Sequence, residues 1–491
     1  MNKLVNFVDL IVNKFWIIFC SLIFGGAVFV KAMYSFGDYP YFTWNLAIDV
    51  FLFIVMLLFY GLLLKYAAKM DRFISYPILW LFFGLCGIII VLLIPIQPFS
   101  DMQYVTDGAL LFSKGDIDGI LASDYLQVIT KNLKVSMFYG ALCVFLPKKV
   151  VSLRIINVLL YLLIAHFMSK IGKNFGLRCH KGIFIMVASY LPLILYCNHV
   201  YFDLPVLCMC TIATYFYTKE RNAKNLIAAG VFLGVGSSMR VLSFLFVIAF
   251  SIDYIFHYKK ELVKSRGKKI IVLMLFILIA CAIPQIVDLV VNSCFRIVDA
   301  DDESIWTLFW MGINEEKFGF MYNEIADGKK TFSDFYNLLI SRNIEQNVKL
   351  FGRKIFWEWS QGTYQAQRYA FGYDATLWNE KFIYETPLTH YFMNDNQTCR
   401  QFINTLMRAQ YLALFFLMII GMVKMDKEDR DKYRMFVYLM FGTFLVLIFY
   451  ELKSRYVFHC MIPMILIAVN GLESCVEKRE LTTKIDSENY I

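Results

Sequence analysis

Long apolar blocks dominate this chain and constrain its fold more than any other feature of the sequence. Of its 491 residues, 59% are hydrophobic and 18% are charged, which is less charge than a soluble protein of this length carries. A helix needs about 20 predominantly apolar residues to cross a bilayer, and several blocks approach or exceed that length. The clear ones are Phe15–Met33, Ala47–Lys69, Pro77–Gln97, Ser152–Lys170, Ile270–Val291, Leu406–Lys424, Met435–Tyr450 and Val457–Leu472.

Further apolar stretches are shorter, and loop charge decides whether they span. They are Ile183–Asn198, Leu204–Thr218, Leu226–Met239 and Val241–His257. Lys and Arg concentrate in cytoplasmic loops, and the connecting segments 65–72, 170–181, 219–224, 259–269 and 424–434 are basic. All five basic segments lie in the cytoplasm if three conditions hold. The N-terminus is cytoplasmic, each of the shorter stretches crosses the membrane, and Phe138–Leu146 does not cross it. The pattern predicts an all-α polytopic membrane protein with about twelve transmembrane helices and both termini in the cytoplasm.

This topology divides the chain into transmembrane and outer parts. They are the N-terminal transmembrane helices (1–97), a first outer loop (98–151), central transmembrane helices (152–291), an extracytoplasmic loop domain (292–405), C-terminal transmembrane helices (406–473) and a cytoplasmic tail (474–491). We expect the first block to be an uncleaved anchor and Phe138–Leu146 to lie in the outer interface. Lys148, Lys149 and Arg154 fall outside against the charge rule, which an anionic lipid headgroup would explain.

The segment 292–405 is soluble-like and rich in Trp, Tyr and Asn, so we expect it to fold. Cys294 and Cys399 lie near its ends and either form a disulfide or remain free thiols. The other cysteines are expected to be apolar packing residues. An acidic cluster, Asp299 to Glu303, either binds a cation or is a solvated loop. The sequence indicates no metal ligand set or cofactor, with a divalent cation as the open alternative.

A carboxylate follows the third clear block at the outer surface, in Gln97-Pro-Phe-Ser-Asp101. Half in water and half against the membrane, Asp101 lies where a general base would have to deprotonate an acceptor hydroxyl. The alternative is that it caps the next helix. Asp203, in the short outer turn before Pro205, has the same two interpretations. The topology puts both acids on one face.

Cations are predicted on the same face. Arg240 separates two apolar stretches near the outer boundary, where an unpaired Arg is costly. It either binds phosphate through parallel hydrogen bonds or extends to the headgroups. The last outer turn brings Lys453 and Arg455 close to Glu451, as a phosphate site or as an interfacial anchor. His459 follows one helical turn later and can share the face of Arg455.

Other classes of function lack their sequence signatures. The net charge is +9, but no basic patch is interleaved with aromatic residues, so nucleic acid is not expected as a partner. No HExxH, GxSxG, Walker or dinucleotide motif is present, which argues against ATP-driven or soluble-cofactor chemistry.

Four pieces of the sequence, in order, resemble membrane glycosyltransferases of the GT-C fold, and most closely the bacterial relatives of dolichyl-phosphate-mannose protein mannosyltransferases. The pieces cover most of the chain from Pro95 on. They are Gln97-Pro-Phe-Ser-Asp101 with Lys114-Gly115-Asp116, Tyr201-Phe-Asp203-Leu-Pro205, Trp310-Met-Gly-Ile-Asn314 to Gly319 with Trp359-Ser-Gln-Gly-Thr363-Tyr364, and Glu451 to Tyr456 with Pro463.

The resemblance implies inverting transfer of a sugar from a polyprenyl-phosphate donor to an extracytoplasmic glycan, lipid or protein acceptor at the cell membrane. Asp101 matches the family's first-loop acid, the expected general base, and Asp203 its second outer acid, so both are candidate catalytic residues. Arg240 and Arg455 would donate to the lipid phosphate. The predicted phosphate site is completed by the neighbours of Arg455, Lys453 and Tyr456.

The chain also departs from the family. Met102 follows Asp101 where the mannosyltransferases usually carry a second acid, which leaves the acceptor type and any dependence on a metal ion open. Two additional helices precede the one that leads into Asp101. The helix around Phe138–Leu146, in contrast, is a family feature.

Other functions stay open from the sequence. A flippase or transporter for lipid-linked saccharides would carry charged residues near mid-membrane and repeated halves. A polymerase or ligase of surface polysaccharide shares the lipid-phosphate donor. A non-enzymatic membrane scaffold is the remaining alternative. The large outer segment and the surface-placed acids favour a transferase over a transporter.

Overall fold

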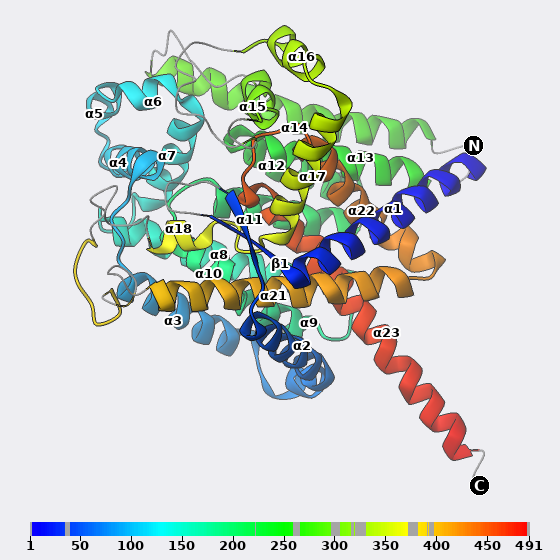
Figure 1. The fold of residues 1–491 in the computed structure, drawn as a ribbon. Helices are drawn as coiled ribbons and strands as arrows, with labels where there is room; N and C mark the ends of the chain where they lie inside the picture. The colour runs from blue at the N-terminus through cyan, green and yellow to red at the C-terminus, as the bar shows by residue number, and fades with distance from the viewer. Residues whose placement is uncertain are drawn as a thin grey trace.

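The protein is a bundle of helices, and its computed structural model describes residues 2–34, 40–220, 222–258, 266–295, 305–315, 319, 330–371, 382–389, 391 and 397–488 (Figure 1). The elements of the first half are α1 (Asn2–Phe29), β1 (Val30–Tyr34), β2 (Pro40–Trp44), α2 (Ala47–Phe73), α3 (Tyr76–Leu93), α4 (Ser100–Lys114), α5 (Ile117–Leu121), α6 (Asp124–Val128), α7 (Thr130–Cys143), α8 (Val150–Asn174), α9 (His180–Ala188), α10 (Leu191–Leu195), η1 (Tyr196–Asn198) and α11 (Asp203–Lys219). The second half contains α12 (Ala223–Met239), η2 (Val241–Ser243), α13 (Phe244–Tyr258), α14 (Arg266–Phe295), α15 (Ile305–Gly312), α16 (Phe332–Ile340), α17 (Ile344–Ser360), α18 (Ala366–Phe371), α21 (Gln397–Lys424), α22 (Lys427–Leu447), η5 (Ser454–Cys460) and α23 (Met461–Glu488).

Among the described residues, seven helical segments are long and apolar enough to cross a membrane, which confirms the prediction of a helical membrane protein. They fall into two groups by burial. In the spans of α1, α2, α3 and α14, 11–28% of the apolar window is buried, whereas the spans of α8, α21 and Ser454–Ser474 are 61–78% buried. Because exposed apolar side chains are stable in hydrocarbon, the first group is positioned to face lipid and the second to form the interior.

The other predicted spans correspond to helices that are shorter, broken or more polar. Helix α9 and the segment Leu191–Asn198 are bent by 56° relative to each other and together could form one span. Helices α11, α12 and α13 have 17, 17 and 15 residues, and α22 begins with the charged run Lys427-Glu-Asp-Arg-Asp-Lys. The chain does break at Arg240 between α12 and α13, as the charge argument requires. A total of about twelve spans remains a prediction.

A two-stranded β-hairpin follows the first helix, which ends before the predicted limit at Met33. Strand β1 pairs with β2 in antiparallel register, with Ala32 opposite Phe42. Helix α1 ends at Phe29 because distant groups satisfy its last carbonyls: Asn45 Nδ2 donates to the carbonyls of Ala27 and Val28 (2.7 Å each). Asn45 lies outside the apolar block, so the block by itself predicts a continuous helix to Met33.

The first outer loop folds as a small group of helices, α4 to α7, at the end of the bundle opposite the N-terminus (Figure 1). The predicted interfacial segment Phe138–Leu146 covers the end of α7 and the turn after Cys143, and α7 packs along α4. Lys148 Nζ donates to the carbonyl of Cys143 (2.8 Å) and so caps α7. Arg154 is buried and donates to the carbonyl of Ile96. Protein carbonyls thus contact these two cations.

The described part of the segment 292–405 is helical and packs into the main core. Helix α17 begins with a capping box in which Asn343 and Gln346 each accept a hydrogen bond from the other's backbone. Trp359 and Tyr364 belong to the same apolar cluster as the membrane helices. The acidic cluster at residues 299–303 lies outside the described residues.

The disulfide alternative for Cys294 and Cys399 is wrong, because both thiols are free. Their environments differ. Cys294 lies exposed in the last turn of α14, whereas Cys399, in the first turn of α21, packs against the main apolar core.

Candidate functional site

Asp101 lies in the first turn of α4, where the chain leaves the membrane helix α3. The preceding Ser100 has φ +50°, a left-handed conformation that is uncommon for a residue other than glycine and that occurs preferentially at functional sites. The helix cap is Phe99, and no side chain caps the helix, so Asp101 does not act as the cap. The Tyr201 hydroxyl donates to Asp101 Oδ2 (3.2 Å).

Asp101 is ionised at neutral pH because cations and hydroxyls surround it. Burial alone would raise the pKa of Asp101, but a hydrogen bond from Tyr125 and the positive charges of Lys453 and Arg455 hold that pKa below its ordinary value. The carboxylate is therefore available to accept a proton, and it lies within the field of the last outer turn.

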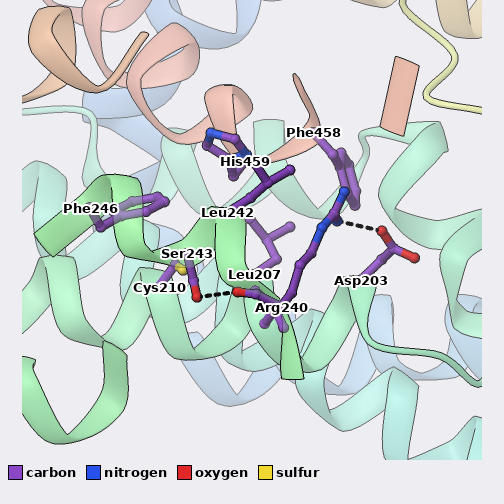
Figure 2. A pocket seen from close by; sticks show the side chains of 10 residues that line it. Asp203, Leu207, Cys210, Arg240, Leu242, Ser243, Phe246, Phe458 and His459 are labelled. Carbon is purple, nitrogen blue, oxygen red and sulfur yellow. Dashed lines mark hydrogen bonds and ion pairs between the residues drawn. The ribbon is translucent and has the colours of Figure 1, made fainter. Parts of the chain in front are cut away.

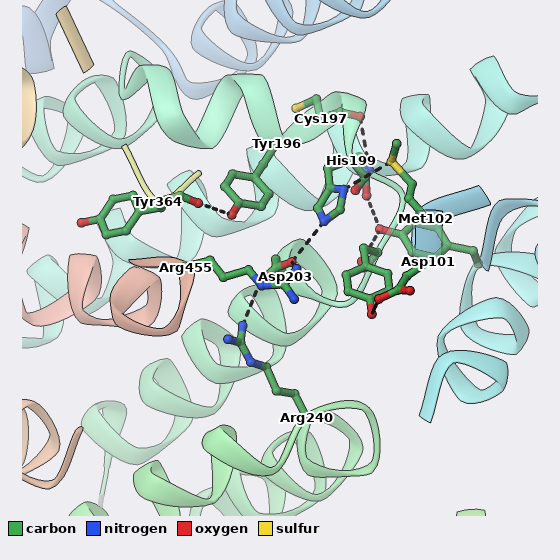
Figure 3. Close-up of polar contacts among 12 residues, drawn as sticks. Asp101, Met102, Tyr196, Cys197, His199, Asp203, Arg240, Tyr364 and Arg455 are labelled. Carbon is green, nitrogen blue, oxygen red and sulfur yellow. Dashed lines mark hydrogen bonds and ion pairs between the residues drawn. The ribbon is translucent and has the colours of Figure 1, made fainter. Parts of the chain in front are cut away.

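Asp203 is buried in the first turn of α11 and is surrounded by positive or protonatable groups, as Figure 3 shows. Its Oδ1 lies 2.8 Å from Arg240 Nη1, and its Oδ2 lies 3.3 Å from His199 Nε2 and 3.8 Å from Arg455 Nη1. Phe202 occupies the cap position, without a side-chain capping bond. The carboxylate of Asp203 thus interacts with cations from distant parts of the sequence and does not cap its own helix.

Arg240 turns inward toward the protein, not outward to the headgroups. Its guanidinium lies over the rings of Phe202 and Tyr456, 4.9 and 4.8 Å from their centroids, an arrangement worth about 0.5–2 kcal/mol. Its Nη2 is buried and has no hydrogen-bond partner among the described residues. Figure 2 shows the small pocket beside it, with Asp203 and the apolar side chains of α11 and α13. The lining residues are Asp203, Val206, Leu207, Cys210, Arg240, Leu242, Ser243, Phe246, Phe458 and His459.

The turn Glu451–Tyr456, predicted to be the last outer turn, is buried, so it is not an exposed interfacial anchor. Lys453 Nζ lies 2.6 Å from Glu451 Oε1, and the Tyr456 hydroxyl donates to Glu451 Oε2 (2.6 Å). Arg455 lies over the ring of Tyr201 at 5.5 Å. Through these contacts the structure brings Asp101, Asp203, Arg240, Lys453, Arg455 and Tyr456 into one cluster.

A buried lysine from α17 holds this turn in place. Lys354 Nζ donates to the carbonyls of Gly312 (2.8 Å), Ile448 (3.2 Å) and Tyr450, which lie at or just beyond the ends of α15 and α22. Burial lowers the pKa of Lys354 to about 8, against the opposing charges of Glu358 and Glu451. Burial likewise raises the pKa of Glu358 well above its ordinary value. A lysine that satisfies orphan carbonyls of two helices fixes their relative position.

Sequence reasoning missed several residues that complete the cluster. His199 bridges the two acidic segments, because its Nδ1 lies 3.3 Å from Met102 Sδ while its Nε2 faces Asp203. The spacing of His199 and Asp203, four residues apart, was the available signal. Tyr125 and Lys354 carry no such signal, since both reach the site through tertiary packing.

Within the described ranges, no three His, Cys, Asp or Glu side chains gather as a metal site would require. The acids of the cluster are instead paired with cations. Comparison of the chain with protein-family models, curated proteins and solved structures gives no match. The chemistry of the cluster is therefore the guide to function.

Proposed function

We propose that this protein is an inverting glycosyltransferase of the GT-C type. It would move a sugar from a polyprenyl-phosphate donor to a glycan, lipid or protein acceptor on the extracytoplasmic face of the cell membrane. The observation that supports this most is that Asp203 contacts both Arg240 and Arg455 while Asp101 lies in the field of Arg455. Two carboxylates and two guanidiniums therefore share one cluster, which is the set of groups that this reaction needs.

The arginines suit a lipid phosphate. A guanidinium binds phosphate oxygens through parallel hydrogen bonds, and Arg240 Nη2 is a buried donor without a partner among the described residues. Leu207, Leu242 and Phe246 line the adjoining pocket, which gives an isoprenoid chain an apolar surface. In this proposal Asp203 is a positioning residue that orients both arginines.

Asp101 would act as the general base. It takes the proton of the acceptor hydroxyl as that oxygen attacks the anomeric carbon, and the bond from that carbon to the phosphate oxygen breaks. The polyprenyl phosphate leaves with the electron pair, and its growing negative charge is stabilised by Arg240, Arg455 and Lys453. The attack comes from the face opposite the leaving group, so the configuration inverts. No nucleotide is needed because the donor is already activated.

The test is transfer of labelled sugar by the purified protein in lipid vesicles. Undecaprenyl-phosphate sugars serve as donors, with membrane extracts as the acceptor source. We expect released undecaprenyl phosphate and a labelled product in wild type and their loss in Asp101→Asn. Equal turnover by both proteins would overturn the assignment of the base.

A second candidate is a flippase or transporter for lipid-linked saccharides, and one observation favours it. Helix α9 and the segment Leu191–Asn198 form a broken pair bent by 56° that leads directly to His199. Discontinuous helices of this kind form substrate sites in transporters. The same vesicles discriminate the two functions, since a transporter moves the intact lipid-linked sugar across the bilayer and releases no undecaprenyl phosphate.

A further inference from the structure

Three uncharged polar side chains close to the charged cluster are fully buried and lack hydrogen-bond partners among the described residues. Neither amide atom of Asn198, neither amide atom of Gln365, nor the hydroxyl of Ser454 has a partner. A buried polar group without a partner costs about 1–3 kcal/mol, so such groups call for a specific explanation.

The segments that carry them meet at one place. Asn198 ends η1, Gln365 precedes α18, and Ser454 begins η5. The Tyr196 hydroxyl of η1 donates to the Tyr364 carbonyl (2.6 Å), as Figure 3 shows. The Phe458 ring of η5 lies 4.7 Å from that of Tyr196 and 4.9 Å from that of Tyr364. Three aromatic rings from the three segments are therefore packed together.

The backbone at this place is strained. Tyr364 and Gln365 have φ values of +52° and +61°, and Gly362 has +70°. For residues other than glycine such conformations cost about 1–3 kcal/mol each and cluster at ligand sites. Gly362 is required as well, because a Cβ there would lie 2.6 Å from the Tyr411 ring. The fold thus sustains two strained residues, and one of them, Gln365, carries a buried side-chain amide without a partner among the described residues.

The same segments continue directly into the charged cluster. Asn198 precedes His199, which contacts Asp203, and Ser454 precedes Arg455, which contacts the same carboxylate. Two of the three unpartnered side chains therefore belong to residues directly adjacent in sequence to members of the charged cluster.

We propose that Asn198, Gln365 and Ser454 form a subsite that binds the hydroxyl groups of an uncharged donor sugar. This inference rests on the proposed function. Amides and hydroxyls both donate and accept, which matches sugar hydroxyls, and none of the three side chains carries the negative charge that an amino sugar would require. The rings of Tyr196, Tyr364 and Phe458 provide the apolar surface beside it.

Stability gives a first test that needs no ligand. Asn157 is the matched control, because it is a buried asparagine whose Nδ2 donates to the carbonyls of Cys197 (3.2 Å) and His199 (3.0 Å), on either side of Asn198. We expect Asn157→Leu to lower the melting temperature of the purified protein, and Asn198→Leu and Gln365→Leu to leave it unchanged or raise it. An equal loss in all three variants would mean that the amides are structural, and would overturn the subsite.

Binding gives the second test, with undecaprenyl phosphate, undecaprenyl-phosphate glucose and undecaprenyl-phosphate 4-amino-4-deoxyarabinose as probes. We expect the neutral sugar to tighten binding over the bare lipid phosphate. Asn198→Leu and Gln365→Leu should each weaken binding of undecaprenyl-phosphate glucose about tenfold, which corresponds to one lost hydrogen bond to a buried group. Binding of the bare phosphate should stay unchanged.

Each remaining outcome is decisive. If the bare phosphate binds but glucose adds nothing, or the amino sugar binds more tightly than glucose, the neutral subsite is refuted while the proposed function stands. If none of the three probes binds the wild type, the proposed function fails, and the subsite fails with it.

Discussion

Arg240 Nη1 lies 2.8 Å from Asp203 Oδ1; the Asp203 side chain is fully buried and the Arg240 side chain is 12% exposed. This contact ties the first turn of α11 to the break between α12 and α13. Removing Arg240 leaves the buried Asp203 carboxylate with Arg455, at 3.8 Å, as its remaining arginine. Losing one member of a buried pair costs more than the pair itself contributes.

Arg240→Met is therefore expected to destabilise the protein by about 3–5 kcal/mol and to abolish binding of undecaprenyl phosphate. Adding Asp203→Asn removes the negative charge that Arg240 no longer pairs. The double variant should recover much of the stability but none of the binding. Thermal unfolding in detergent and lipid binding measure the two effects separately. Additive losses in the double variant would contradict the pairing.

Asp101→Asn is expected to lower the rate of sugar transfer by about 10²–10⁴-fold, the usual contribution of a general base. Donor binding should change little, because the arginines remain. The rate is measured with labelled donor at saturation. Asp118→Asn, an exposed acid in the same outer loop, is the matched control and should retain full activity.

The acidic limb of the pH–rate profile should lie below the ordinary aspartate value of about 3.9. Cations and hydroxyls hold the pKa of Asp101 down, so the carboxylate stays ionised as the pH falls. Tyr125→Phe removes one of these hydrogen bonds, raises that pKa and moves the limb to higher pH. Tyr104→Phe, in the ring stacked on Tyr125 at 4.0 Å, should leave the limb in place. A limb that shifts equally in both variants would argue against Asp101 as the titrating group.

Lys354→Met should impair both stability and activity although Lys354 contacts no substrate in our proposal. The variant leaves the carbonyls at the ends of α15 and α22 unsatisfied, and each lost charge-assisted hydrogen bond is worth about 1.5–3 kcal/mol. The turn that carries Arg455 loses its support, so the KM for the donor should rise as the melting temperature falls. Lys349→Met, at an exposed position of the same helix, is the control. Wild-type kinetics in Lys354→Met would show that the turn holds its position unaided.

Cys294 reports on the orientation of the protein in the membrane. It is a free, exposed thiol at the end of α14 that leads into the large outer segment. A membrane-impermeant maleimide added to intact cells should label it, and Cys294→Ser should remove that part of the signal. Labelling that needs permeabilised cells would reverse the predicted topology.

The sequence predicts the seven long apolar helices because apolar length is a local property, whereas the total of about twelve spans stays a prediction. It also predicts which charged residues gather, since loop charge assigns Asp101, Asp203, Arg240 and Arg455 to one face; their catalytic roles remain predictions. It does not predict the β-hairpin, because α1 ends where Asn45 satisfies its carbonyls. Nor does it predict the unpartnered amides of Asn198 and Gln365, since hydrogen-bond satisfaction is decided by tertiary packing.

The contact of Arg455 with Asp203 has a consequence for synthesis of the protein. A ribosome that has translated the chain through α14 has delivered Asp101, Asp203 and Arg240 to the translocon, but the second guanidinium is still to come. Until the final helices enter the bilayer, Asp203 lacks one of its two arginine neighbours. The charged cluster is therefore complete only after the last segment of the chain has been inserted.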